Sequence, residues 1–494
     1  MRPATTLVLP LLLLIPLQVR AQSLEEAAWT LPNLLRKVPP LQHDNAGRFP
    51  MICIEPFLLT ADDRSWQDAK PLPAAMIREL KKRGLTQWIP PDERYIQVAL
   101  ALQKEKAGVI MMQGMAFNGP PDEVPSSMHL LPEGYKGLKR PGQQPKFPCP
   151  LVLDGWVKTA EKLRATFRKY REAGVHIDAV WLDWEIEPMA GDAQLDEAKH
   201  CSRCRQQFPP GILDDKERYR AFISRCRLQL FSVYFVAPIL EHYPGCSVTN
   251  WEEVISTADD PTPNWAGTRK IPPLDLGMFT AANPVAYGNT IWYDYHWREE
   301  RGWPLDAAHM DRIYTQVMLG ELSVHERNAM RVAPHLQSIP WVDRFCADNR
   351  DPKIPILTRP RYREILRHLW LRGADGMQIF NPLWFKEDAV RLAIATEEIE
   401  DAVAIYDELL GYRKFLDDGR VMNTDTPTAE FEGVIWSGLR TGDKAVVRAF
   451  TQADKPQNFS CKPFDEADEI ELDAPPSGKW HLLERDGKTV KITK

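Results

Sequence analysis

Residues 154–188 read DGWVKTAEKLRATFRKYREAGVHIDAVWLDWEIEP. Apolar residues spaced three or four apart, from Val157 to Tyr170, predict an amphipathic helix, and Gly174 predicts its end. An apolar run then begins at Ile177 and predicts a buried strand that ends in acidic and aromatic residues. A helix that leads into such a strand is the repeating unit of a parallel β/α fold.

The same unit recurs from about Arg48 to Pro382. The expected strands are residues 51–57, Thr86–Ile89, Gly108–Gln113, Ala179–Glu185, Cys246–Trp251, Thr290–His296, Arg331–Ser338 and Gly376–Asn381. Eight parallel strands are the number that closes a barrel. We therefore predict an α/β fold, a (β/α)8 TIM barrel over residues 45–400.

The composition changes after the barrel. A linking helix and linker, residues 401–424, precede short alternating runs at Val434–Leu439, Ala445–Phe450, Glu469–Leu472, Trp480–Glu484 and Thr489–Ile492. Such runs, with Asp486-Gly487 as a hairpin turn, predict antiparallel strands. We expect residues 425–494 to form a small, sandwich-like antiparallel β-domain, for which packing against the barrel is favoured over contact with sugar.

The N-terminus predicts export. Arg2 precedes an apolar run from Leu7 to Leu17, which is about half of the roughly 20 residues that cross a bilayer. Val19-Arg20-Ala21 then offers the small residues of a cleavage site. We expect a signal peptide over residues 1–21 and a secreted or periplasmic protein without a membrane span.

The composition favours carbohydrate over nucleic acid as a partner. The chain has 62 basic and 68 acidic residues, a net charge of −6, and no basic stripe interleaved with aromatic residues. Its 16 tryptophans and 13 tyrosines offer flat rings on which sugars stack, although more than half are expected to pack in the core. The oligomeric state does not follow from these numbers.

Eight cysteines in an exported chain permit disulfides. Cys201 and Cys204 have the two-residue gap of a metal knuckle, but zinc takes about four ligands and the sequence has no second pair of this kind. Disulfides or free thiols are therefore favoured over zinc at these two residues. We expect neither a metal nor another cofactor.

The fourth expected strand ends in two carboxylates. Side chains two residues apart on a strand point the same way, so Asp183 and Glu185 are predicted to lie together at the carboxyl end of a barrel strand. Because such proximity disfavours ionising both, one carboxyl can stay protonated near neutral pH and act as an acid. Glycoside cleavage requires this arrangement. The alternative is a solvated acidic loop or a pair that caps the next helix.

This segment resembles a known group of enzymes. Asp178, Asp183 and Glu185 match the first, third and last members of the Asp-x-x-Asp-x-Asp-x-Glu motif of the chitinase-like glycoside hydrolases, with Trp181 in place of the middle aspartate. Residues 179–185 also resemble the Asp-Trp-Glu segment of the hyaluronidase family. Two expected strands later, the stretch IWYDYH at 291–296 is similar to the chitinase-like Met-x-Tyr-Asp segment, with Ile291 replacing the methionine.

The resemblance implies an exported glycoside hydrolase that cleaves an N-acetylhexosamine-containing polysaccharide or oligosaccharide by substrate-assisted, retaining catalysis. Glu185 would protonate the leaving oxygen while the acetamido oxygen of the substrate attacks the anomeric carbon. Asp183 would orient the amide and balance its charge. Tyr293 would donate a hydrogen bond to the amide oxygen, and Asp294 would help to place the sugar.

Other strand ends carry competing groups. Glu252 could pair with Glu185 as nucleophile and acid on a non-acetylated glycan, at a separation of about 5 Å, or could begin a helix. Glu55, Asn381 and Trp384 are further candidates for substrate binding, Trp384 as a sugar platform. A non-catalytic glycan-binding barrel would keep the aromatic residues but lose the acid, and the 11 histidines lack the clustering of a metal-dependent hydrolase.

Overall fold

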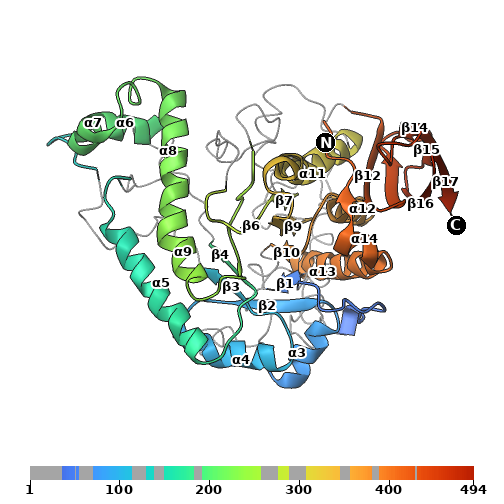
Figure 1. The fold of residues 1–494 in the computed structure, drawn as a ribbon, viewed down its shortest axis with the longest axis horizontal. Coiled ribbons are helices and arrows are strands. Elements are labelled where there is room, and N and C mark those ends of the chain that lie inside the picture. The colour runs from blue at the N-terminus through green and yellow to red at the C-terminus, as the bar shows by residue number, and fades with distance from the viewer. Residues whose placement is uncertain are drawn as a thin grey trace, which may run out of the picture.

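The computed structural model describes residues 36–49, 52–54, 71–113, 129–137, 149–182, 192–256, 276–288, 307–344, 357–380, 389–428 and 431–493. Helices surround a central group of parallel strands, and an antiparallel β-domain lies at one side of them (Figure 1). The expected order of a β/α unit followed by a C-terminal antiparallel sheet is confirmed.

The central sheet is parallel throughout. Its strands, in spatial order, are β5 (Ser247–Asn250), β4 (Ala179–Leu182), β3 (Ile110–Gln113), β2 (Leu85–Ile89), β1 (Ile52–Ile54), β10 (Met377–Ile379), β9 (Trp341–Asp343) and β7 (Val285–Tyr287). A short parallel pair, β6 (Ala281–Ala282) with β8 (Gln337–Ser338), accompanies it. Strands β1 to β5 are neighbours in the order of the sequence, and helices connect most of them, which is the usual arrangement of a parallel sheet.

The sheet is rolled, but its ladder of hydrogen bonds is open between β5 and β7 in the described part of the chain. Four strands separate β4 from β9, which is about 24 Å in a flat sheet. Nevertheless the rings of Trp181 on β4 and Trp341 on β9 have centroids 5.7 Å apart. The Trp251 Nε1 after β5 donates to the Tyr287 hydroxyl on β7 at 3.2 Å, so side chains join the two edge strands.

Helices connect the strands. They are α3 (Ala74–Lys81), η2 (Glu93–Tyr95), α4 (Ile96–Lys104), α5 (Asp154–Glu172), α6 (Asp192–His200), α7 (Ser202–Gln207), α8 (Lys216–Phe231), the π-helical turn η5 (Ser232–Val236), α9 (Ala237–Leu240), α11 (Ala307–Val332), α12 (Arg359–Leu371) and α13 (Ala389–Leu410). In α5 the buried face contains Ala160, Leu163, Phe167 and Tyr170, as the spacing predicted. Val157 is exposed, and its neighbour Trp156 is buried in its place.

One helical run, Lys216–Leu240, is long and apolar enough to cross a membrane by length and composition. Its most apolar window is 61% buried inside the protein, as expected for a core helix.

One predicted strand differs from the structure, and two strands were not predicted. The range Arg331–Ser338 was expected to be a strand, but α11 continues to Val332 and a turn follows, so only β8 and β9 around Pro340 are extended. Proline cannot donate to a ladder, which explains the interruption. The strands β6 and β7 were missed because Asn283-Pro284 between them reads as a turn. The predicted strand Thr290–His296 lies outside the described residues.

The C-terminal domain consists of two packed sheets. One has the order β11 (Arg420–Val421), β12 (Val434–Thr441), β13 (Lys444–Thr451), β16 (Lys479–Asp486) and β17 (Thr489–Thr493), and the other pairs β14 (Gln457–Cys461) with β15 (Ile470–Ala474). All five predicted strands are present. The strand β14 was missed because its sequence is mostly polar and exposed. The helix α14 (Arg413–Asp418) lies between α13 and this domain.

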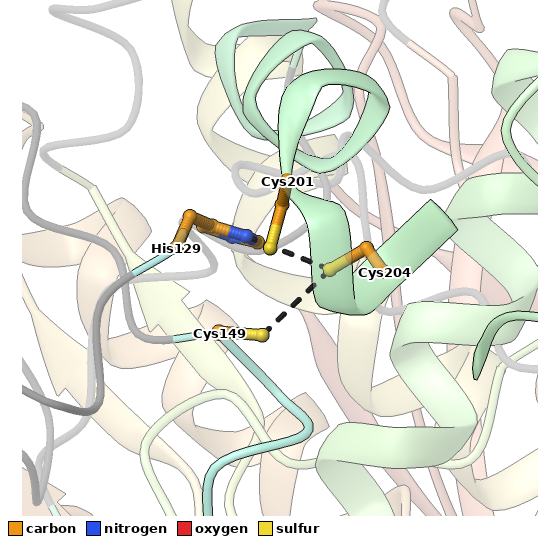
Figure 2. A group of neighbouring side chains, drawn as sticks. All are labelled: His129, Cys149, Cys201 and Cys204. Atoms are coloured by element: carbon orange, nitrogen blue, oxygen red, sulfur yellow. Dashed lines mark hydrogen bonds between the residues drawn. The ribbon is translucent and has the colours of Figure 1, made fainter. Parts of the chain in front are cut away.

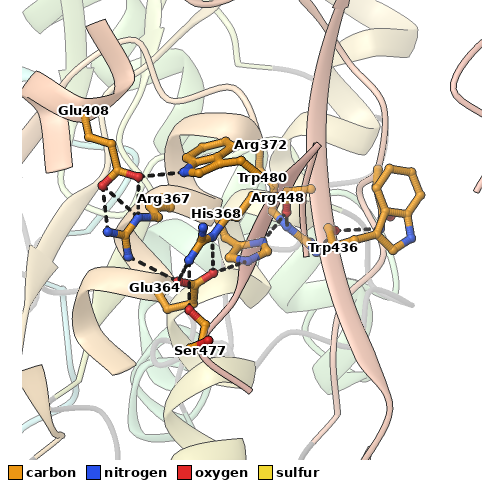
Figure 3. A network of polar contacts seen from close by, with 11 residues as sticks. Glu364, Arg367, His368, Arg372, Glu408, Trp436, Arg448, Ser477 and Trp480 are labelled. Carbon is orange, nitrogen blue, oxygen red and sulfur yellow. Dashed lines mark hydrogen bonds and ion pairs between the residues drawn. The ribbon is translucent and has the colours of Figure 1, made fainter. Parts of the chain in front are cut away.

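Buried polar contacts join the domain to α12 and α13 (Figure 3). Glu364 of α12 accepts two hydrogen bonds of 2.7 Å from Arg448 of β13. Glu408 of α13 accepts from Trp480 Nε1 of β16 at 2.7 Å. The hydroxyl of Ser437 on β12 contacts both His368 and Arg372 at 2.8 Å. These contacts support the packing role that was favoured for the domain.

Candidate active site

Most residues predicted for catalysis or substrate binding lie outside the described part of the chain. These are Glu55, Asp183, Glu185, Tyr293, Asp294, Asn381 and Trp384. The strand that precedes the two carboxylates is described, and it ends at Leu182. In the sequence Asp183 follows directly.

The residues of β4 alternate between two environments. Val180 and Leu182 belong to the main core, against the helices. Ala179 and Trp181 belong to a second core on the inner face of the rolled sheet. Trp181 is 1% exposed and packs against Trp88 of β2, with ring centroids 6.4 Å apart. The position that holds aspartate in the chitinase-like motif is therefore part of an aromatic core in this protein.

Asp178 has a structural role in this arrangement. It precedes β4, and its carboxylate accepts a hydrogen bond from the Val109 backbone N–H at 2.8 Å, which joins the beginnings of β4 and β3. A cleft lined by Thr86, Gly108 and Asp178 lies at the same amino-terminal edge. Active sites of parallel α/β folds lie at the opposite, carboxyl edge, so this cleft is not the candidate site.

Aromatic residues support the carboxyl edge of the sheet. Tyr287 ends β7 and lies against Phe380, which follows β10, with ring centroids 4.4 Å apart. The Tyr287 hydroxyl accepts from Trp251. Asn250 ends β5, is fully buried, and donates to the Trp251 carbonyl at 2.9 Å. Apolar rings with polar groups at their ends are suited to binding sugars.

Glu252 lies two residues after β5 and has an unusual backbone. Its φ of 58° is in the left-handed region, and its side chain is 1% exposed. A residue with a side chain adopts this conformation at a cost of about 1 kcal/mol or more, and such residues cluster at functional sites. Its neighbour Glu253 forms a buried ion pair with Arg227 at 2.9 Å and is structural. Glu252 therefore remains a candidate site residue at the carboxyl edge.

A second group of reactive side chains lies in the connections that follow β3 and β4. Figure 2 shows His129, Cys149, Cys201 and Cys204 directed toward one another. Their ligand atoms all lie within 4.8 Å of one another, and all four residues are buried. Cys201 and Cys204 are free thiols in the structure. Of the two favoured interpretations of this pair, the structure therefore has the free thiols.

Hydrogen bonds within the cluster shift the pKa values of its side chains. A hydrogen bond with Cys204, and a second with His129, lower the pKa of Cys149 to about 4. Burial opposes protonation of His129, but hydrogen bonds with Cys149 and Cys201 raise its pKa to about 9. Burial acts against ionisation of Cys201, yet hydrogen bonds with His129 and with backbone N–H groups lower its pKa to about 7. The cluster therefore stabilises thiolate at Cys149.

The sequence analysis missed His129 and Cys149 as partners of the cysteine pair. Each lies alone in sequence, without the short spacing that marks Cys201 and Cys204. Only the packing of the segment 129–137 and of the turn at 149–153, before α5, against α6 and α7 brings them together. The search for a second closely spaced pair could not find ligands that come from separate segments.

No protein-family model and no curated protein matches the chain. Among solved structures it is similar to a polyextremophilic β-galactosidase from the Antarctic haloarchaeon Halorubrum lacusprofundi, with 13% identity, coverage of 72% of this chain and 58% of that chain, and a TM-score of 0.46. It is also similar to Gan42B, a GH42 β-galactosidase from G. stearothermophilus, with 10% identity, coverage of 75% and 59%, and a TM-score of 0.45. A third similar structure is Eubacterium rectale Amy13B, with 8% identity, coverage of 92% of this chain and 98% of that chain, and a TM-score of 0.43. The chain spans less than two thirds of the length of both galactosidases.

Proposed function

We propose that this protein is a glycoside hydrolase of the (β/α)8-barrel kind, with Glu185 as its general acid and Asp183 as the neighbouring carboxylate. The observation that carries the proposal is the alternation in β4, which places Trp181 on the inner face of the rolled sheet. Asp183 and Glu185 follow Trp181 at the two-residue period of a strand, just after β4 ends. From that period we infer that both carboxylates face the mouth of the proposed barrel.

The proposed substrate contains an N-acetylhexosamine, and the proposed mechanism is substrate-assisted. In it the protonated Glu185 donates to the leaving oxygen, and Asp183 balances the charge of the bridged ion that the acetamido group forms. Tyr293, Asp294, Glu55, Asn381 and Trp384 are the proposed contacts to the sugar. Tyr287, Phe380 and Trp251 contact one another at the carboxyl edge of the central sheet, where this site is proposed.

Glu252 favours a second mechanism on the same fold. Its burial and left-handed backbone after β5 place a carboxylate at the end of the strand beside β4. Paired with Glu185, it would act as the nucleophile of an ordinary retaining glycosidase, which requires no acetamido group.

The test is hydrolysis of a panel of N-acetylated and non-acetylated polysaccharides by the wild-type protein and by Glu185→Gln. The amide cannot donate the proton, so turnover is expected to fall by about a hundredfold or more, with binding of the glycan nearly unchanged. Hydrolysis of none of the panel, or equal turnover by the variant, would contradict the proposal. Export is proposed from the signal sequence alone, and mass spectrometry of secreted protein should find a chain that starts at Gln22.

A further inference from the structure

We propose that His129, Cys149, Cys201 and Cys204 bind one Zn²⁺ ion, which joins the β3–α5 connection to the helices α6 and α7. This inference does not depend on the proposed glycosidase. It rests on the convergence of four buried ligand atoms of the types that zinc prefers, from three separate segments of the chain.

The spacing of the ligand atoms fits one tetrahedral ion. With Zn–S bonds of about 2.3 Å and a Zn–N bond of about 2.0 Å, a tetrahedron has S···S edges of about 3.8 Å and S···N edges of about 3.5 Å. The Cys149 and Cys204 sulfurs are 3.7 Å apart, and the Cys204 sulfur is 3.5 Å from His129 Nδ1. A sulfur–sulfur distance of 3.7 Å is also far beyond the about 2.05 Å of a disulfide.

The surroundings of the sulfurs suit thiolates bound to a metal. The Leu130 backbone N–H donates to the Cys201 sulfur at 3.3 Å, and the Cys204 backbone N–H donates to the same atom. Hydrogen bonds of this kind orient metal ligands and offset the negative charge of a site with three thiolates. Binding would release the thiol protons to solvent, and His129 would enter as a neutral imidazole.

The cluster lies in a small core of its own. Cys149, Cys201 and Cys204 pack with apolar residues that are separate from the main core, namely Val152, Leu195, Ala198, Phe208, Tyr219 and Ile223. The helices α6 and α7 have nine and six residues, and helices this short are marginal without tertiary support. A core of this size gains most from a metal staple, as small domains do.

The site is closed, which assigns it a structural role. Four protein ligands fill the tetrahedron and leave no position for water or substrate, unlike the three ligands of a catalytic zinc. Direct contacts also join the segment 129–137 to α6 and α7. The Ser202 N–H donates to the Leu130 carbonyl at 3.1 Å, and the ring centroids of Tyr135 and His200 are 4.9 Å apart. The ion would hold the segment 129–137 and the turn at 149–153, before α5, onto α6 and α7.

The experiment measures metal in the full mature chain, purified without chelators and then dialysed against a weak one. Elemental analysis is expected to give about one zinc per chain. Replacement of the metal by Co²⁺ should give the intense visible bands of a tetrahedral ion together with a thiolate charge-transfer band. Cys149→Ser and Cys204→Ser should each retain well below half of the zinc. Cys226→Ser, on the adjacent α8, and Cys461→Ser, in the C-terminal domain, should retain all of it.

The wild-type measurements decide the question even if a ligand variant fails to fold. The proposal is overturned if the folded wild-type protein holds no stoichiometric metal and takes up no Co²⁺ with those bands. It is equally overturned if mass spectrometry of the unreduced protein finds a disulfide between any two of Cys149, Cys201 and Cys204. Full zinc retention by both serine variants would also overturn the proposal, because the metal would then be bound at another site.

Discussion

Trp181 occupies the position of the middle aspartate in the chitinase-like motif that this segment resembles. Its ring packs with Trp88 and Trp341 in the interior of the rolled sheet. A carboxylate at this depth would need a partner for its charge, whereas an indole gains from burial. Asp178, at the other end of the strand, accepts a hydrogen bond from the Val109 N–H and so has a structural role. Of the matched motif positions, only Asp183 and Glu185 remain as candidates for chemistry.

Replacing Asp183 with Asn should slow hydrolysis by about a hundredfold, because the amide keeps the shape of the side chain but removes the charge that stabilises a cationic intermediate. The pH–rate profile should change as well, since two neighbouring carboxyl groups that interact would titrate as a pair. Steady-state rates across pH are the measurement. An unchanged rate and profile would show that the two carboxylates do not act together.

Glu252→Gln separates the two mechanisms. Substrate assistance predicts turnover within about threefold of wild type, inhibition by a thiazoline mimic of the bridged ion, and no sugar attached to the protein. The two-carboxylate mechanism predicts a sugar ester on Glu252 after treatment with an activated fluorosugar. Intact-mass spectrometry after labelling decides, and circular dichroism of the variant checks that its strained backbone still folds.

At the scale of elements, a buried ion pair joins α12 to β13. Glu364 and Arg448 are 7% and 8% exposed, and their hydrogen bonds are bidentate. Breaking one side of such a pair leaves a buried charge, so Glu364→Gln should destabilise the protein by about 3 kcal/mol. Urea denaturation followed by tryptophan fluorescence gives the free energy of unfolding.

The matched control is Asp465→Asn, which removes the Asp465 carboxylate from its pair with Arg440 in the same domain. Asp465 is 85% exposed, so solvent screens this pair and the free energy of unfolding should change far less than in Glu364→Gln. The double variant Glu364→Gln with Arg448→Met should lose less than the sum of the two single changes, because no buried charge is left alone. Additive losses would mean that the pair does not interact in solution.

At the scale of the whole molecule, the same interface predicts sensitivity to acid. Hydrogen bonds with His368 and Arg448 overcome the effect of burial and lower the pKa of Glu364 to about 2, from 4.5. Burial lowers the pKa of His368 to about 4, from 6.5. Both groups bind protons more readily in the unfolded chain, so the unfolded state gains protons first as the pH falls.

Stability from His368 should therefore be lost between about pH 6.5 and 4, and stability from Glu364 between about pH 4.5 and 2. Urea denaturation at a series of pH values should show the free energy of unfolding falling through both ranges. In Glu364→Gln the slope below about pH 4.5 should be reduced. A slope equal to that of the wild type would assign the acid sensitivity to other groups.

Local patterns in the sequence determined the elements. The three-to-four spacing in α5, the apolar run of β4 and the Asp486-Gly487 turn each involve neighbours in the chain, so their structure follows from their own residues. The predicted strand Ala179–Glu185 begins where β4 begins, and its last residues carry the candidate carboxylates. The parallel sheet and the antiparallel domain could be predicted for this reason.

Only the tertiary structure decided which distant residues meet. The rings of Trp181 and Trp341 meet across the interior of the rolled sheet, while its ladder stays open between β5 and β7 in the described part of the chain. His129 and Cys149 meet Cys201 and Cys204 because separate segments pack on α6 and α7. The periodicity of the sequence cannot predict such contacts, since each depends on how the chain as a whole buries its apolar surface.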